Sequence, residues 1–326
     1  MASRRTSKAS LWFAGGLLIS CAAGAVLAGG IGAGDWPSYG GHATGDHFSD
    51  LTQITPANVA QLTPAWRLDM GPGGLQASPL VIDGTLYTLT PAQGVVALDP
   101  ATGAKRWAYT PADGGHQPVR GLAYWSQDGA RALFTSHGTM LTALDPATGQ
   151  PIASFGQQGH IDLREGLGRD TAQMAVFLTS PGVVYRDLVI VGFRTSESKP
   201  AAPGVVRAYD ARTGKLRWQF NTLPRPGEPG SETWAKGSLD TAGAANPWAG
   251  MVVDEARGIV FAPTGSAVDD FYGADRLGNN LYANSLVALD ANTGKRIWHF
   301  QGVHHDVWDR DFPTPPVLMT VRHQGR

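Results

Sequence analysis

Side chains that could bind a metal ion or move a proton gather in the segment VHHDVWDRD, from Val303 to Asp311. It holds two histidines, three aspartates and a tryptophan within nine residues. Imidazole and carboxylate groups are metal ligands, a carboxylate can act as a general base, and an aspartate can also simply cap a turn. Choosing among a metal site, a catalytic base and a polar loop requires the elements that position this segment.

A repeated unit occupies most of the chain. Each unit is an apolar strand, a turn of the form DxxTG and a second strand; the turns open at Asp99, Asp145, Asp210 and Asp290. The aspartate can accept backbone N–H bonds of its turn, and the glycine supplies a positive φ. Further hairpins precede these units, with turns at Asp83-Gly84, Arg186-Asp187 and 256–258. Two hairpins per unit predict an all-β chain of four-stranded antiparallel sheets.

Four-stranded sheets repeated along a chain are typical of a β-propeller, in which they form radial blades. Trp107, Trp218 and Trp298 follow their turns at equivalent places, and we expect them to wedge between neighbouring blades. A blade takes about 40–45 residues, so residues 35–326 are expected to form only part of a ring. The chain is therefore predicted to be a fragment of a longer propeller.

Residues 1–34 predict a targeting segment followed by a short linker. Basic residues precede an apolar run at 11–28 that ends in small residues, as in a secretory signal, and the run is also long enough for a retained anchor. Cys21, the only cysteine, lies in LISC, which resembles a lipoprotein cleavage site. These alternatives all predict a periplasmic protein, either free or associated with the inner membrane.

Charge and cysteine usage exclude some classes of function. The formal net charge is −1, and no run of Lys or Arg follows the first few residues, so we expect no nucleic-acid partner. With one cysteine, the sequence contains no CxxCH haem-attachment motif.

Several segments together resemble one enzyme family. The repeats, the opening DWPSYGGHATGDHFSDLTQITPANVAQLTPAW, and VRGLAYW, NPWAGMVVDEARGIVFAPTGS and VHHDVWDRD resemble the pyrroloquinoline quinone (PQQ)-dependent dehydrogenases, above all their glucose, quinate and polyol branch. The resemblance extends from Asp35 to the C-terminus and implies roughly the N-terminal half of an eight-bladed propeller.

The resemblance implies oxidation of a sugar, polyol or cyclic alcohol with PQQ and Ca²⁺ or a similar divalent cation. In that chemistry a base takes the hydroxyl proton, the quinone takes the hydride, and the cation polarises a quinone oxygen. Membrane ubiquinone is the expected electron acceptor, because no haem motif occurs in the sequence.

The resemblance also implies the base and the metal ligands. Asp309, in the HxxWD segment, corresponds to the catalytic base and to one metal ligand. Glu197 and Ser266 correspond to the other ligands, which supply the hard oxygen atoms that Ca²⁺ prefers. Serine stands where many relatives have an asparagine, so Asp269 or Asp270 is an alternative ligand.

Three further residues correspond to cofactor contacts. Trp248 matches the indole on which the quinone stacks, Arg120 the arginine that pairs with a cofactor carboxylate, and Thr179 a hydroxyl at the cofactor rim. His305 or Asp306 is expected to support the base rather than to bind zinc.

Two other functions stay open. A non-catalytic propeller could serve as an envelope scaffold, and a truncated chain could be inactive on its own. A scaffold would keep the repeats but would not need the HHDxWD, RGLAYW and NPW segments together.

The resemblance also bears on the identity of the metal ion. Asp311 lies two residues beyond Asp309, a spacing that occurs in the sugar and polyol branch without implying a lanthanide.

Overall fold

The computed structural model describes residues 34–113, 115 and 117–324. The chain divides into two units, Met1–Gly30 and Ile31–Arg326, and all described residues belong to the second unit. The predicted export segment, with the apolar run at 11–28 and Cys21, lies outside the described residues. Within the described ranges, no helix has the length and apolar character needed to cross a membrane.

Four antiparallel sheets, each of four strands, make up the unit. The first contains β1 (Leu80–Ile82), β2 (Thr85–Leu89), β3 (Val95–Leu98) and β4 (Lys105–Tyr109); the second contains β5 (Ala123–Gln127), β6 (Ala130–His137), β7 (Met140–Leu144) and β8 (His160–Asp162). The third contains β10 (Val183–Tyr185), β11 (Leu188–Val191), β13 (Val205–Asp210) and β14 (Leu216–Asn221); the fourth contains β15 (Val252–Asp254), β16 (Ile259–Pro263), β17 (Ser285–Asp290) and β18 (Arg296–Gln301). A small pair, β9 (Val176–Phe177) with β12 (Arg194–Thr195), and the 3-10 helices η1 (Val59–Gln61), η2 (Ser231–Thr233) and η3 (Ser238–Asp240) complete the elements. The predicted all-β architecture of four-stranded antiparallel sheets is confirmed.

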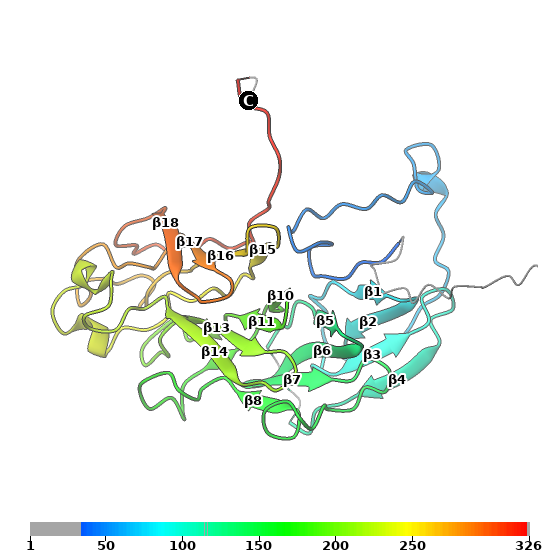
Figure 1. Ribbon diagram of the computed structural model, residues 1–326, viewed down its shortest axis with the longest axis horizontal. Coiled ribbons are helices and arrows are strands. Elements are labelled where there is room, and N and C mark those ends of the chain that lie inside the picture. The colour runs from blue at the N-terminus through cyan, green and yellow to red at the C-terminus, as the bar shows by residue number, and fades with distance from the viewer. Residues whose placement is uncertain (1–33, 114, 116, 325–326) are drawn as a thin grey trace, which may run out of the picture. The chain divides into compact units, whose positions relative to one another are not determined.

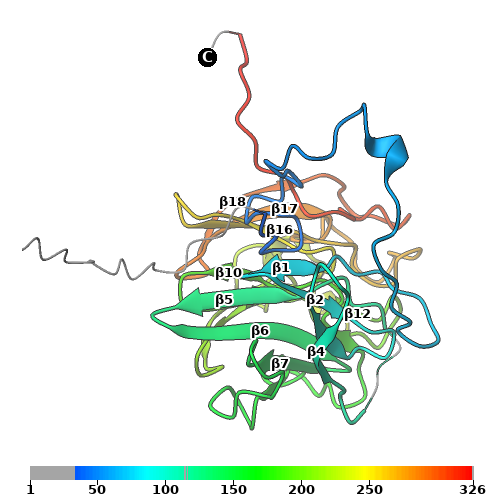
Figure 2. The same ribbon diagram turned by 90° about the vertical axis from the view of Figure 1, so that its right-hand side faces the viewer.

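The sheets follow one another in chain order, from β1–β4 in cyan to β15–β18 in orange (Figure 1). The first strand of the third sheet, β10, lies against the first strands of its neighbours, β5 and β15. Figure 2 shows β5, β6 and β7 side by side, with β10 next to β5. First strands that meet while the outer strands diverge are the arrangement of propeller blades.

Apolar side chains of consecutive sheets pack against one another. Leu89 and Leu133 join the first sheet to the second, and Phe134 and Val189 join the second to the third. A further cluster joins the third sheet to the fourth. Because β11 lies between two neighbouring sheets, all of its residues are buried. This explains why the inner strands read as continuous apolar runs rather than as alternating ones.

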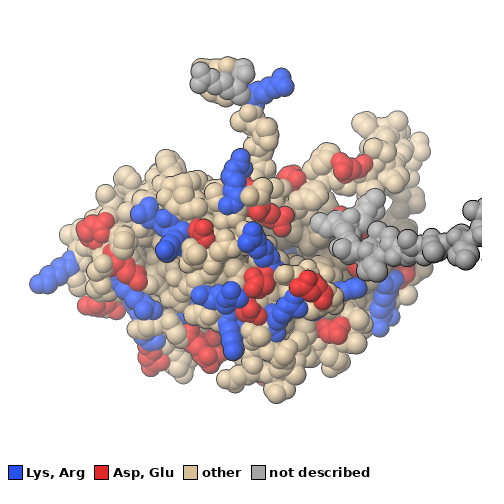
Figure 3. Space-filling model, viewed as in Figure 1, with Lys and Arg blue, Asp and Glu red and all other residues tan. Residues whose placement is uncertain are grey.

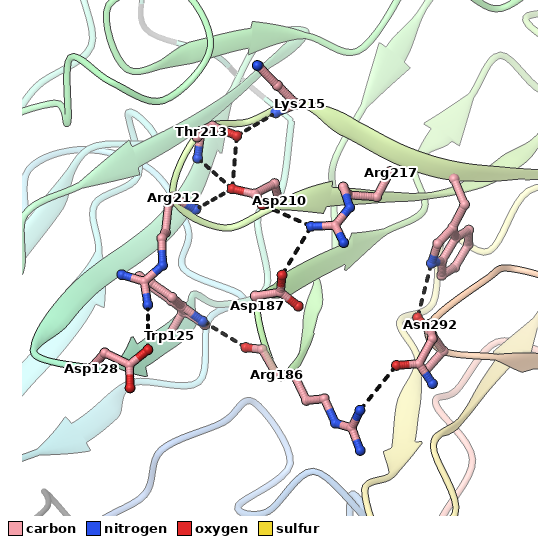
Figure 4. A network of polar contacts seen from close by, with 12 residues as sticks. Trp125, Asp128, Arg186, Asp187, Asp210, Arg212, Thr213, Lys215, Arg217 and Asn292 are labelled. Atoms are coloured by element: carbon pink, nitrogen blue, oxygen red, sulfur yellow. Dashed lines mark hydrogen bonds and ion pairs between the residues drawn. The ribbon is translucent and has the colours of Figure 1, made fainter.

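The repeated turn works as its sequence predicts. In the third sheet, Asp210 Oδ1 accepts hydrogen bonds from the backbone N–H of Arg212 (3.1 Å) and Thr213 (2.9 Å) and from the Thr213 hydroxyl (2.9 Å) (Figure 4). Its other oxygen accepts a bond from Arg217, which also reaches Asp187, each at 3.0 Å. The aspartate thus closes the turn and ties two hairpins together.

Two of the predicted wedges join neighbouring sheets. Trp107 Nε1 donates to Pro146 O at 2.9 Å, and Trp218 Nε1 donates to Ala291 O at 3.0 Å, each acceptor lying in the DxxTG turn of the next sheet. Trp298 differs: it is 41% exposed and packs on Phe261 of its own sheet. No sheet follows β18 among the described residues, so the wedge expected at Trp298 stays a prediction.

Charged side chains of both signs are interspersed on the face shown in Figure 3. Elsewhere in the described residues, ion pairs join charged side chains of opposite sign, such as Arg164 with Asp162 at 2.6 Å and Arg212 with Asp128 at 3.1 Å. On this face no extended region carries a single sign of charge.

Candidate functional site

A cavity of about 510 Å³ lies among loops that flank the strands of the second, third and fourth sheets. All six residues that the resemblance implies line this one cavity: Arg120, Thr179, Glu197, Trp248, Ser266 and Asp309. They come from the loops before β5, β10 and β15 and after β12, β16 and β18. The fold therefore gathers residues that are far apart in the sequence.

Trp248 forms an aromatic wall of the cavity and is held at several points. Its carbonyl oxygen accepts bonds from the hydroxyls of Ser180 (2.8 Å) and Thr179 (3.3 Å). Its indole Nε1 donates to Asp311 Oδ2 at 2.6 Å. A planar ring fixed in this way can serve as a stacking surface for a flat aromatic ligand.

Arg120 brings positive charge next to that ring. Its guanidinium carbon lies 5.3 Å from the centre of the Trp248 ring, and Nη1 donates to Thr179 O at 3.3 Å. Burial lowers the pKa of Arg120 from its ordinary value. Within the part of the chain that the structure describes, no carboxylate forms an ion pair with Arg120. A half-buried guanidinium without an anionic partner, beside an indole face, fits a planar cofactor that carries carboxylates.

Thr179 occupies the expected place, but its hydroxyl is already engaged. The residue is fully buried, and its Oγ1 donates to Trp248 O. The hydroxyl can still accept a bond, but it has no free proton for the cofactor rim. In this structure Thr179 supports the position of Trp248.

Glu197 is paired with a cation of the protein itself. Arg194 Nη2 donates to Glu197 Oε1 at 2.5 Å, and the Glu197 side chain is 71% exposed. Arg194 Nη1 also donates to Gln117 Oε1 at 2.9 Å. An oxygen expected to bind a divalent cation is thus held by a guanidinium.

Ser266 lines the cavity, and its hydroxyl is engaged by two side chains. Its Oγ donates to Asp306 Oδ2 at 2.6 Å and accepts a bond from Asn284 Nδ2 at 2.9 Å. Across the described ranges, no group of three or more His, Cys, Asp or Glu side chains is arranged to hold a metal ion. Glu197 is thus paired with Arg194 and Ser266 with Asp306, and the ligand set of Glu197, Ser266 and Asp309 stays a prediction.

Asp309 is presented to the cavity by a tight loop. Asp306, which is buried, accepts bonds from the backbone N–H of Arg310 (2.7 Å) and Trp308 (3.2 Å), and Asp309 itself has a φ of 54°. Burial raises the pKa of Asp309, and the negative charges of Asp311, Glu197 and Asp306 raise it further. An exposed carboxylate with a raised pKa has the properties of a general base.

Asp270 is a further residue of the site. The sequence indicated it only as an alternative metal ligand. It lines the same cavity and is only 8% exposed. Burial and the charges of Asp309, Asp311 and Glu197 raise its pKa to about 7. The only sequence signal was a pair of adjacent aspartates in VDDFYG.

The two histidines of VHHDVWDRD have different surroundings. His305 Nδ1 lies 3.0 Å from Gly278 O and 3.2 Å from Asn280 Oδ1, so the ring is held by the 278–280 loop. His304 is exposed. Of the two residues expected to support Asp309, Asp306 bonds the backbone of the loop that carries it.

The sequence and structure match those of known proteins. Residues 36–326 match a family model described as "Glucose/ethanol/alcohol dehydrogenase, beta-propeller domain", with PQQ as its short name. The chain is 31% identical over 337 residues to quinoprotein glucose dehydrogenase A of Acinetobacter calcoaceticus, covering 91% of this chain and 41% of that protein. It is 32% identical over 321 residues to quinate/shikimate dehydrogenase (quinone) of Acinetobacter baylyi, covering 87% of this chain and 39% of that protein.

Solved structures show the same architecture. The quinohemoprotein alcohol dehydrogenase of Comamonas testosteroni matches with a TM-score of 0.78 and 28% identity, over 90% of this chain and 44% of that one. The chain thus spans about two fifths of the length of these relatives.

Proposed function

The chain belongs to the PQQ-dependent dehydrogenase β-propeller family, and on this basis we propose that it contributes the PQQ site of a dehydrogenase for a sugar, polyol or cyclic alcohol. The observation that carries the proposal is that Arg120, Trp248 and Asp309 line one cavity together with the other implied residues. Relatives named for glucose, quinate/shikimate and glycerol are the source of the substrate classes.

The cofactor would lie against Trp248, with its carboxylates near Arg120. When bound, PQQ supplies an electrophilic ortho-quinone that accepts a hydride. Asp309 would accept the proton of the substrate hydroxyl, and its raised pKa strengthens it as a base. Arg194 also lines the cavity and adds positive charge for an acidic cofactor.

A Ca²⁺ or similar divalent cation is part of the proposal only in a limited sense. Glu197 would have to exchange Arg194 for the cation, and Ser266 is bound to Asp306. The proposed roles of Trp248, Arg120 and Asp309 do not depend on a metal ion.

The electron acceptor and location are proposed on indirect grounds. Membrane ubiquinone is supported by relatives whose names carry the word quinone. A periplasmic location, with association to the inner membrane through residues 11–28, is supported by the signal-like sequence alone.

The proposal is tested with Asp309→Asn, which keeps the size of the side chain but removes the base. We expect the PQQ-loaded full chain to oxidise glucose, quinate or glycerol in a dye-linked assay, and the variant to be slower by roughly 10²–10⁴-fold. PQQ should still bind the variant, as equilibrium dialysis would show. Asp128→Asn, an exposed carboxylate in the β5–β6 turn, is the matched control.

Two results would contradict the proposal. The first is a wild-type chain that binds PQQ but oxidises none of the three alcohols. The second is an Asp309→Asn variant that retains wild-type rates, which would show that another group takes the proton.

A further inference from the structure

Asp311 contacts two separate segments of the cavity wall through its two carboxylate oxygens. Oδ2 accepts the bond from Trp248 Nε1 at 2.6 Å, and Oδ1 accepts a bond from the backbone N–H of Ser266 at 2.5 Å. These donors lie in the loops before β15 and after β16, whereas Asp311 follows β18. One side chain therefore joins three loops that meet at the cavity.

The Asp311 carboxylate lies directly against the backbone of Gly265. A Cβ atom at this glycine would lie 2.7 Å from Asp311 Oδ2 and 2.8 Å from Oδ1, closer than such atoms approach. Position 265 can therefore hold only glycine while Asp311 keeps its place. This close fit leaves the carboxylate little freedom to leave its two donors.

The contacts of Trp248 make Asp311 the group that sets the orientation of the ring. Thr179 and Ser180 bond the Trp248 carbonyl oxygen, which fixes the backbone and leaves the side-chain torsions free. Arg120 lies over the ring at 5.3 Å, a contact that tolerates rotation. Among the described residues only Asp311 bonds the indole N–H, and a bond to an ionised acceptor is roughly twice as strong as a neutral one.

We propose that Asp311 is a positioning residue for the cofactor: its carboxylate fixes the indole plane of Trp248 and the backbone at Ser266 relative to the loop that presents Asp309. The inference rests on the proposed function, since it concerns the cofactor of the same cavity. It gives the neighbouring carboxylates separate tasks. Asp309 faces the cavity as the base, and Asp311 is occupied by two N–H donors and orients the stacking surface.

The first test is PQQ affinity in a double-mutant cycle on the full chain. Asp311→Asn exchanges one acceptor oxygen for an amide that repels an N–H donor, so we expect PQQ to bind roughly tenfold more weakly, within the effect of losing a hydrogen bond to a charged group. Trp248→Phe removes the indole N–H that Asp311 holds. Adding Asp311→Asn to Trp248→Phe should then weaken PQQ binding less than Asp311→Asn does in the wild-type chain, because only the contact with Ser266 remains to be lost.

The second test measures the hydrogen bond between Asp311 and the Trp248 indole in the absence of PQQ. In ¹⁵N-labelled protein, the Trp248 indole N–H resonance is identified by its loss in Trp248→Phe. It should move upfield in Asp311→Asn and stay in place in Asp128→Asn, the exposed control.

The outcomes separate this inference from the proposed function. An unchanged indole resonance, an unchanged PQQ affinity in Asp311→Asn, an equal loss in both Trp248 backgrounds, or no PQQ binding by the wild-type chain would each overturn the role of Asp311. A chain that binds PQQ, shows the expected coupling and oxidises no alcohol would overturn only the proposed function.

Discussion

Glu197 and Arg194 form an ion pair at the place where the resemblance implies a metal ligand. The pair is short, at 2.5 Å, but its Glu197 side chain is 71% exposed. Exposed ion pairs contribute little, about 0.2–1 kcal/mol, because water screens the charges and the long side chains lose freedom. If Glu197 is a metal ligand as the resemblance implies, we expect Arg194 to be a weak competitor of the cation.

Replacing Arg194 should make this competition visible. Arg194→Gln removes the guanidinium but keeps a polar side chain that can still bond Gln117. We expect Ca²⁺ to bind the PQQ-free chain more tightly, by up to about fivefold, which is the affinity equivalent of the ion pair. Calorimetric titration measures the change, with Arg131→Gln, which breaks the exposed pair with Asp83, as the control. Equal or weaker Ca²⁺ binding would contradict the competition.

The same residues show what the sequence could predict at this scale. Resemblance identified Glu197, Ser266 and Asp309, and all three line the cavity. Their hydrogen-bond partners were not predictable, because the bond from Ser266 to Asp306 depends on rotamers and joins positions in different loops. Asp270 was noted only as an alternative, since its burial arises from the loop after β16 and not from its neighbours in sequence.

Among the structural elements, the DxxTG turn reverses the chain and also contacts a neighbouring sheet. Its glycine has a positive φ, and at Gly149 and Gly294 it also lies against the tryptophan of the preceding sheet. At Gly294, with a φ of 70°, an added Cβ would lie 2.4 Å from the Trp218 ring. The turn chemistry was readable from the sequence, whereas the contact with Trp218 required knowing which sheets are neighbours. Trp298 shows the converse: no DxxTG turn of the described residues covers its ring, and the residue is 41% exposed.

A pair of glycine substitutions separates these two functions. Gly294→Ala suffers both an unfavourable φ and overlap with Trp218. Gly84→Ala suffers only the φ, since Gly84 has a φ of 67° and nothing within 4 Å of an added Cβ. We expect Gly294→Ala to lower the free energy of unfolding by about 1–3 kcal/mol more than Gly84→Ala, the usual cost of overpacking. Urea unfolding measures both, and equal losses would show that the inter-sheet contact contributes nothing.

At the scale of the whole molecule, the repeat predicted the sheets but not the cavity. The spacing of the turns and the apolar runs determine four-stranded units, and burial between sheets follows from them. The walls of the cavity come from the segments between strands, such as 222–251 and 264–284, which contain little regular structure. Their conformation depends on contacts such as Arg276 Nη2 with Asp306 O, at 2.5 Å, that join distant loops. No local pattern encodes those contacts.

This origin of the cavity determines how a bound cofactor should affect the whole unit. The cavity is lined by loops next to β5, β10 and β15. These are the first strands of three sheets, and β10 contacts both β5 and β15. A ligand that binds only the folded state stabilises it by about 2.7 kcal/mol at a concentration one hundred times its dissociation constant. We therefore expect saturating PQQ to slow amide hydrogen exchange in all three of these strands. Trp248→Ala should abolish this protection, because it removes the stacking surface that the three loops support. Protection confined to the loops of the fourth sheet would show that PQQ binds one blade and does not connect the three.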